Sequence, residues 1–141
     1  MRCMVFVKAT ADSEAGVMPS EKDLAEMGAF NEELVNAGVM LDGAGLHPSS
    51  KGLRVEYDDN GAQVIDGPFA ETKELVAGYW VWEVKSMDEA VEWARRIPFR
   101  HGESVEIRPF FDPEDFGDAY TDELKERDAA LDEKIRERRE S

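Results

Sequence analysis

Two stretches of this chain are apolar on both sides of an extended backbone, and they restrict its possible folds more than any other feature. Side chains alternate between the two faces of a strand, so residues 4–9 and 79–85 each present apolar groups to both faces of a sheet. The alternating sets are Val5 and Val7 against Met4 and Phe6, and Trp80 and Trp82 against Tyr79 and Val81. A strand of this kind needs cover on both faces. The sequence therefore predicts a sheet buried between two layers.

Two predicted helices supply one of these layers. Ser20 and Asp23 form a capping pair, and Ser86 with Glu89 forms a capping box, so each pair marks the start of a helix. The first helix is predicted to bury a stripe and to stop near Gly38, and the second to stop at Pro98. The predicted buried positions are Leu24, Met27, Phe30 (or Asn31) and Leu34 in the first helix, and Val91, Ala94 and Ile97, flanked by Ala90 and Trp93, in the second.

The remaining segments complete an antiparallel sheet. Residues 12–17 are predicted to be flexible, and residues 39–46 form a strand whose Gly43 and Gly45 indicate a bulge or a close approach. A hairpin over 53–57 and 62–65 turns at Asn60-Gly61. The last strand, 104–111, contains Pro109, which favours an edge or a strand end.

The order strand–helix–strand, hairpin, strand–helix–strand is typical of an α+β fold of the ferredoxin-like, split βαβ plan, with an inserted hairpin. Both helices then lie on one face of the sheet. A chain of 141 residues has no second layer to spare. We therefore expect a symmetric homodimer packed sheet to sheet.

The C-terminal part differs in character from the rest. From Asp112 onward there are twelve acidic and six basic residues, with Leu124, Leu131 and Ile135 at helical spacing. We expect a domain over residues 1–117 and a charged helical tail over 118–141, packing lightly on the body or on a partner. A frayed terminus is the alternative.

Composition excludes several classes of function. The net charge of −15 argues against nonspecific binding to nucleic acid or to an anionic membrane, and we expect neither as a partner. No apolar run approaches the ~18 residues of a membrane span, and we expect no signal peptide at the start of the chain. With one cysteine, Cys3, no internal disulfide can form, and we expect a cytoplasmic protein. No zinc-ligand spacing or phosphate-binding loop is present, so we expect neither a metal nor a cofactor.

Residues 66–74, with the sequence DGPFAETKE, join two predicted antiparallel strands by more residues than such a loop needs. Asp commonly accepts a bond from the backbone N–H two residues later, but here that residue is Pro68, which has none. The Asp66 carboxylate must bond another donor, stay solvated, or face a ligand. The architectural alternative is that it accepts from Phe69 or Ala70 and only shapes the loop.

This motif, followed by Gly78 and an aromatic strand, resembles the YCII-related family, specifically its DGPF-motif branch. The resemblance extends to GAGLHP at 43–48, DEA at 88–90, EIRP at 106–109 and EDFG at 114–117. It implies a dimeric α+β barrel in which two ferredoxin-like sheets face each other. It also implies a histidine–aspartate pair in a cleft, and for the DGPF branch an association with extracytoplasmic-function sigma factors.

Asp66 and His47 are the candidate catalytic pair, because a carboxylate bonded to an imidazole gives a base suited to neutral pH. Arg108 is a candidate for binding a substrate carboxylate. The other candidate substrate-binding residues are Trp80, Trp82, Phe69, Glu71 and Lys73, although the tryptophans are equally explained as core and the charged pair as a surface network.

Two functions follow from these residues. The first is a cofactor-independent acid–base enzyme, such as an isomerase or lyase, acting on a small anionic organic molecule. The alternative is a non-catalytic dimeric module that binds a small ligand or acts in sigma-factor signalling.

Overall fold

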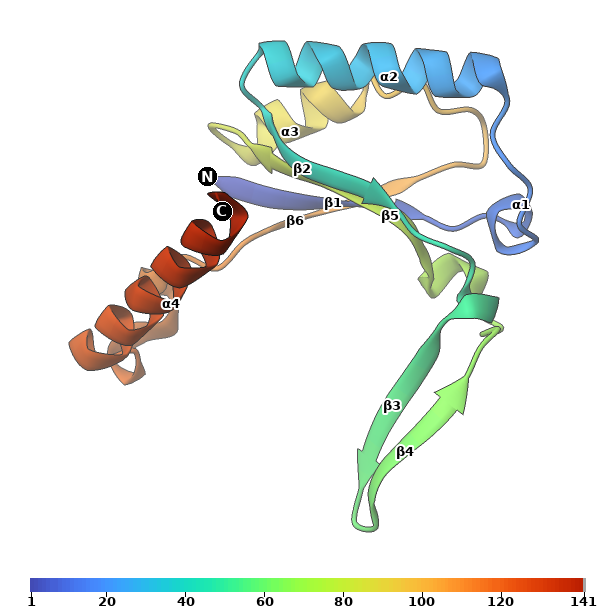
Figure 1. Ribbon diagram of the computed structural model, residues 1–141. Coiled ribbons are helices and arrows are strands. Elements are labelled where there is room, and N and C mark those ends of the chain that lie inside the picture. Colours follow the sequence, from blue (N-terminus) through green and yellow to red (C-terminus); the bar gives the residue numbers. More distant parts are fainter. Residues whose placement is uncertain (141) are drawn as a thin grey trace. The chain divides into compact units, whose positions relative to one another are not determined.

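The computed structural model describes residues 1–140, which form two compact units, Met1–Pro109 and a second that begins at Phe110. In the first unit, β1 (Arg2–Lys8), α1 (Ala11–Glu14), α2 (Glu21–Asn36) and β2 (Met40–Gly45) come first. The 3-10 turn η1 (Ser49–Lys51), β3 (Leu53–Asp58), β4 (Gly61–Asp66) and the turn η2 (Thr72–Glu74) follow. The unit ends with β5 (Val76–Glu83), α3 (Met87–Ala94) and β6 (Val105–Pro109) (Figure 1).

The sheet has the predicted ferredoxin-like plan. Its strand order is β2-β5-β1-β6, and all three pairings are antiparallel. The β2–β5 register shifts between Met40 and Asp42, next to Gly43, which is the bulge that the glycines of this strand indicated. Pro109 ends β6, an edge strand that pairs with β1 alone, so its missing N–H costs no ladder bond between central strands.

Helices α2 and α3 cover the same face of the sheet (Figure 1). Ser20 and Asp23 exchange the two bonds of a capping box at the start of α2. At the start of α3, Ser86 accepts from the Glu89 N–H, but the Glu89 carboxylate accepts from the Lys85 N–H, so only half of the predicted capping box forms. Under the helices lies the core, in which the central strands and both helices meet. It consists of Cys3, Val5, Phe30, Leu34, Val39, Trp80, Trp82, Val84, Ala90 and Ile97.

Three sequence-based expectations for the helical segments are corrected. Leu24 is 60% exposed, because the buried stripe of α2 starts a turn later, and Val91 is exposed while Ala90 is fully buried in its place. Residues 12–17, expected to be flexible, begin inside the short helix α1. Thr10 and Ser13 cap this helix reciprocally.

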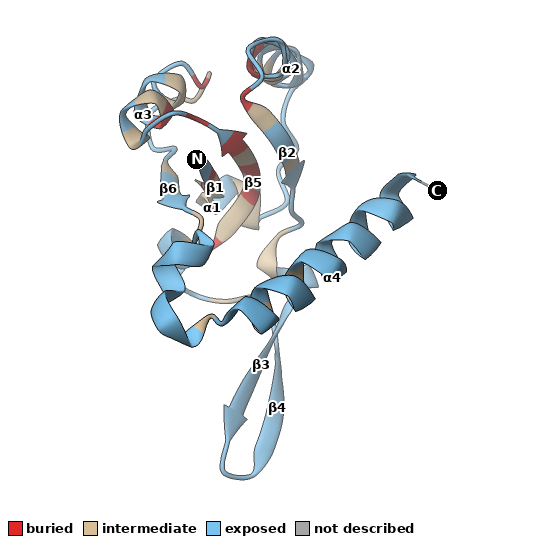
Figure 2. Ribbon diagram, turned by 90° about the vertical axis from the view of Figure 1, so that its left-hand side faces the viewer, coloured by how far each residue is buried: buried red, intermediate tan, exposed pale blue. Residues whose placement is uncertain are grey.

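The β3–β4 hairpin has the predicted register, with Val55 opposite Val64 and a turn at Asn60-Gly61. Every residue of both strands is exposed (Figure 2). The hairpin is therefore a two-stranded sheet without a layer on either face among the described residues.

The second unit contains η3 (Pro113–Ala119) and α4 (Asp122–Glu140), so the charged tail is helical as predicted. Its aromatic residues stack in sequence, with 4.8 Å between the ring centroids of Phe111 and Phe116 and 5.4 Å between those of Phe116 and Tyr120. The Tyr120 hydroxyl donates to Asp128 at 2.6 Å, and this bond raises the pKa of Tyr120 because it favours the protonated phenol.

Candidate functional site

The segment after β4 is fastened to the turn before β3. The Gly67 N–H donates to the Gly52 carbonyl at 3.0 Å, and the Gly67–Pro68 peptide bond is cis. A Cβ added at Gly67 would lie 1.8 Å from the carbonyl oxygen of Ser49. Only glycine fits at this point, because the two backbones meet without room for a side chain.

Ser49 connects this segment to α1. Its hydroxyl accepts from the Phe69 N–H at 3.0 Å and donates to the Glu14 carboxylate, while its N–H donates to the same carboxylate at 2.9 Å. The Arg54 guanidinium lies 3.8 Å from the centroid of the Phe69 ring. Phe69 is therefore held on both its backbone and its ring, and it is half-buried.

The Phe69 N–H is thus bonded to Ser49 and not to Asp66. The Asp66 carboxylate and the His47 ring are both exposed, and neither has a hydrogen-bond or ion-pair partner within residues 1–140. The two residues lie on opposite sides of the Ser49 turn along the chain, at the base of the hairpin, and they are not hydrogen-bonded to each other. Of the environments predicted for the Asp66 carboxylate, two therefore remain: it is solvated, or it contacts another molecule.

The other charged candidates are also at the surface. Glu71 and Lys73 are exposed and form no ion pair with each other. Arg108 lies opposite Met4 on β6 and is exposed. Glu106 does not pair with Arg108: its carboxylate lies 3.9 Å from the Lys8 ammonium instead.

The two tryptophans lie on the helix-covered face of β5. Trp82 is fully buried in the core. Trp80 is 5% exposed, packs edge-on against Phe30 at 6.0 Å between ring centroids, and donates its Nε1–H to Asn31 Oδ1 at 2.9 Å. Trp82 is thus a packing residue, whereas Trp80 also borders an open space.

That space is a cavity of about 280 Å³ between α2 and the β2–β5 edge. Its lining is mostly apolar, with Met27, Met40, Phe99 and the backbone of the Gly43–Gly45 region around the Trp80 ring. The full lining is Val7, Met27, Asn31, Met40, Gly43, Ala44, Gly45, Ala77, Gly78, Tyr79, Trp80 and Phe99. A small apolar cavity with one fixed polar group is the usual form of a small-molecule site.

Asn31 is the polar group of this cavity. An indole N–H can only donate, so the bond to Trp80 fixes the oxygen of the Asn31 amide toward β5. The Asn31 amide nitrogen has no partner in the part of the chain that the structure describes, and it carries two donors. Sequence reasoning placed Asn31 as an alternative to Phe30 in the helix stripe. The signal that could have identified Asn31 was a polar residue within an otherwise apolar helical stripe.

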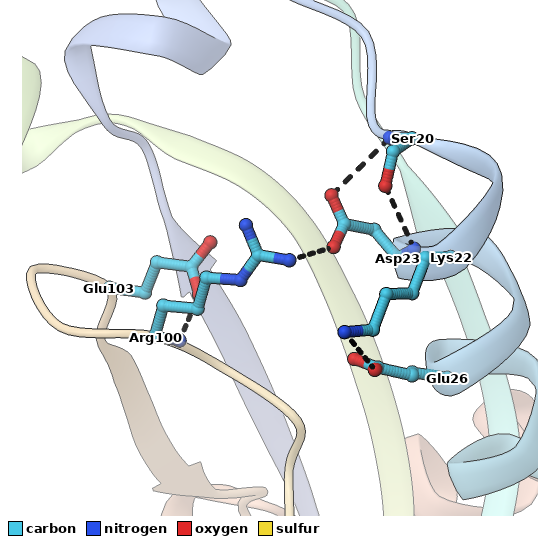
Figure 3. A network of polar contacts seen from close by, with 6 residues as sticks. All are labelled: Ser20, Lys22, Asp23, Glu26, Arg100 and Glu103. Carbon is cyan, nitrogen blue, oxygen red and sulfur yellow. Dashed lines mark hydrogen bonds and ion pairs between the residues drawn. The ribbon is translucent and has the colours of Figure 1, made fainter.

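A charged cluster that includes Asp23, Arg100 and Glu103 lies at the start of α2 (Figure 3). The Arg100 guanidinium bonds to the Asp23 carboxylate at 2.5 Å, and the Arg100 N–H donates to Glu103 at 2.6 Å. Bonds from the backbone and side chain of Ser20 lower the pKa of Asp23, with a further contribution from Arg100. Two more cavities, of about 250 and 660 Å³, are lined in part by these side chains.

Two structural findings concern other classes of site. Within residues 1–140, no three His, Cys, Asp or Glu side chains are grouped so as to hold a metal ion. None of the helices in this range has both the length and the apolar character needed to cross a membrane.

The fold and the cavity define a ferredoxin-like α+β protein with a pocket suited to a small molecule. The chain belongs to the YCII-related domain family, whose model matches residues 1–112. Assignment to the DGPF-motif branch stays a prediction.

Two known proteins resemble this chain. An uncharacterised protein, R00369, of Rhizobium meliloti (strain 1021) is 32% identical over 91 residues, which cover 63% of this chain and 73% of the relative. Among solved structures, 5-chloro-2-hydroxyhydroquinone dehydrochlorinase (TftG) of Burkholderia phenoliruptrix AC1100, in complex with 2,5-dihydroxybenzoquinone, is 17% identical with a TM-score of 0.46. The match covers 79% of this chain and 94% of that one.

Proposed function

We propose that this YCII-related protein binds a small, largely apolar organic molecule in the cavity between α2 and the β2–β5 edge. The observation that carries the proposal is the Asn31 amide, whose oxygen is held by Trp80 while its two N–H donors remain without a partner among residues 1–140. A ligand with a carbonyl, carboxylate or phenolate oxygen would accept from these donors. The rest of such a ligand, flat and apolar, would lie against Trp80, Phe99 and Met27.

The lining favours binding over chemistry. Tyr79 is its only titratable lining residue, and the register of β5 places the Tyr79 side chain on the opposite face of the sheet, with Phe6. Acid–base catalysis requires a group within hydrogen-bond reach of the proton it moves. The non-catalytic module is therefore the function that this cavity supports better.

Asn31→Asp tests the proposal with little change of shape. A carboxylate at position 31 still accepts from the Trp80 indole but offers no donor to a ligand. Benzoate, an aromatic carboxylate, is a suitable probe, and tryptophan fluorescence and calorimetry would report its binding. We expect Asn31→Asp to weaken benzoate binding about tenfold or more, since a hydrogen bond to a charged group contributes roughly 1.5–3 kcal/mol.

Asn36→Asp is the matched control, because it makes the same chemical change at an exposed position of the same helix. Equal benzoate affinity in wild type and Asn31→Asp would contradict the proposal that the Asn31 amide binds the ligand. A second variant, Gly45→Val, adds volume to the cavity lining, because Gly45 lines the cavity and a Cβ added there meets no heavy atom within 4 Å. Gly28→Ala, also in open space but on α2, is its control.

A homodimer is part of the proposal. On the sheet face away from the helices, Met4, Phe6, Tyr79 and Val81 are half-buried in the single chain. A second copy packed on this face would remove these side chains from water. Sedimentation over a range of concentrations tests this, and a monomer at every concentration would contradict it.

Acid–base chemistry at Asp66 and His47 is a second candidate. The observation in its favour is that both side chains are exposed and unpartnered at the base of the hairpin, where a second molecule can reach them. A base acting next to a carbonyl exchanges the substrate proton with solvent. Deuterium incorporation from D₂O into small lactones and keto acids, followed by NMR, would reveal it, and both Asp66→Asn and His47→Gln should abolish it.

A further inference from the structure

The β3–β4 hairpin has one apolar and one polar face. Residues directly opposite each other in a strand pair share a face, so the observed register separates apolar from polar side chains, with Ile65 and Asp66 as the exceptions. One face carries Leu53, Val55, Tyr57, Ala62 and Val64, with Asp66 at its base. The other carries Arg54, Glu56, Asp58, Gln63 and Ile65.

The apolar face is open to water in the described chain. Tyr57 is 83% exposed, Val64 64% and Leu53 57%. A lone two-stranded hairpin is marginally stable in water, and a contiguous exposed apolar strip of this kind is typical of an interaction surface. An apolar partner surface would therefore cover this strip and stabilise the hairpin.

The same chain offers such a surface on the open face of its four-stranded sheet. Met4, Phe6, Tyr79 and Val81 form its apolar part. Arg108, opposite Met4 on this face, is exposed and has no ion-pair or hydrogen-bond partner within residues 1–140. The hairpin's apolar face carries the opposite charge at one point, the unpartnered Asp66 carboxylate. The two faces are thus complementary in polarity, and Asp66 and Arg108 offer one pair of opposite charges between them.

We propose that the hairpin of each subunit packs its apolar face against the open sheet face of a second copy, with Asp66 directed to the partner subunit's Arg108. The inference rests on the proposed homodimer and identifies the segment that joins it. A two-fold axis satisfies both faces at once, because each copy supplies one hairpin and one sheet face.

The charge of the chain favours a second copy as the occupant. Each copy carries a net charge of −15, so two copies associate most readily through surfaces without this acidic excess. The hairpin's apolar face carries a single acid. On the sheet face, the acids Asp42, Glu83 and Glu106 are matched by the bases Arg2, Lys8 and Arg108. The acidic side chains Glu56 and Asp58 lie on the hairpin's other face, away from the proposed contact.

A pair of hairpin variants tests the contact. Val55 and Val64 are opposite each other on the apolar face, so Val55→Glu with Val64→Arg places a cross-strand ion pair there and retains a reason for the strands to pair. Gln63→Arg, opposite Glu56, places the same ion pair on the polar face and is the matched control. We expect the double variant to raise the dimer dissociation constant at least about tenfold and the control to leave it unchanged. Sedimentation velocity measures both.

A charge exchange tests the pairing of Asp66 with Arg108 independently. Asp66→Arg and Arg108→Asp should each weaken the dimer, and the double exchange should restore it. Circular dichroism of each variant separates loss of the dimer from loss of the fold.

The possible outcomes separate the inference from the proposed function. A wild-type protein that stays monomeric overturns both the dimer and the hairpin contact. A wild-type dimer that the Val55/Val64 variant leaves intact overturns the hairpin contact alone. Benzoate binding and the Asn31 variants are independent of either result, because that cavity lies on the helix-covered side of the sheet.

Discussion

Strands β5 and β3 both carry apolar side chains at alternate positions, and these two sets have opposite fates. In β5, Trp80 and Trp82 are buried beneath two helices, whereas in β3, Leu53 and Tyr57 are exposed. Alternation alone determines which side chains share a face. A strand face becomes part of the core only when another layer covers it. Helices α2 and α3 cover one face of β5, whereas no layer of the described chain covers β3.

The sharpest test of this difference is to truncate one aromatic residue in each strand. Trp82→Ala leaves a large cavity in the core and should lower the free energy of unfolding by about 3–5 kcal/mol. Tyr57→Ala removes an exposed ring and should change monomer stability by less than about 0.5 kcal/mol. Urea denaturation at low protein concentration measures both, and similar losses would mean that the hairpin is packed within the monomer.

The junction between the two regions is the next most sensitive point. Gly67→Ala forces a Cβ to within 1.8 Å of the Ser49 carbonyl oxygen, so the backbone must shift. We expect a loss of about 1–3 kcal/mol, the usual cost of overpacking.

Gly52→Ala, on the neighbouring strand start, is the control for Gly67→Ala. Its Cβ would lie 3.5 Å from the same Ser49 oxygen, an ordinary contact. Equal stability of the two variants, measured by thermal unfolding, would show that the loop moves aside at little cost.

A smaller effect is expected where the hairpin holds the 66–74 segment. Arg54→Gln removes the cation that lies over the Phe69 ring. Exposed cation–π contacts contribute about 0.5–1 kcal/mol, so the loss of stability should not exceed that. Faster hydrogen exchange at the Phe69 amide, with unchanged exchange in β5, would show that the effect is local.

The smallest effect concerns the cap of α2. The bonds from Ser20 lower the pKa of Asp23 below its value in the unfolded chain. Its contribution to stability is therefore complete above the unfolded pKa, near 3.8, and is lost as the pH falls through the lower folded value. The melting temperatures of wild type and Asp23→Asn should differ near neutral pH and converge in acid, and a constant difference would contradict this assignment.

Much of the sheet was predictable because its signals are local. The capping residues Ser20 and Ser86, the Asn60-Gly61 turn and Pro109 each act within a few residues, and the structure places each as predicted. The errors at Leu24 and Val91 have a different origin. Helical spacing defines a face only to within about one residue, and the position of the sheet below selects between neighbours.

The site was less accessible to sequence reasoning. The Asn31 amide matters because Trp80, 49 positions away, holds its oxygen, and no local pattern contains that bond. Ser49 likewise connects Glu14 and Phe69 across the sequence. The motif at 66–74 indicated that this loop has a role beyond joining two strands. In the structure, its glycine is required by a close backbone contact with Ser49, and its aspartate has no partner in the described chain.

The lone cysteine has a practical consequence. Burial disfavours the thiolate and raises the pKa of Cys3, which is fully enclosed in the core. Maleimide and iodoacetamide react with thiolates, so the folded protein should behave toward these reagents as if it contained no thiol. A cysteine introduced at Asp59, in the exposed turn of the hairpin, would then be the only position to accept a fluorophore or a spin label. In the proposed dimer, the distance between two such labels could then be measured without first replacing a native cysteine.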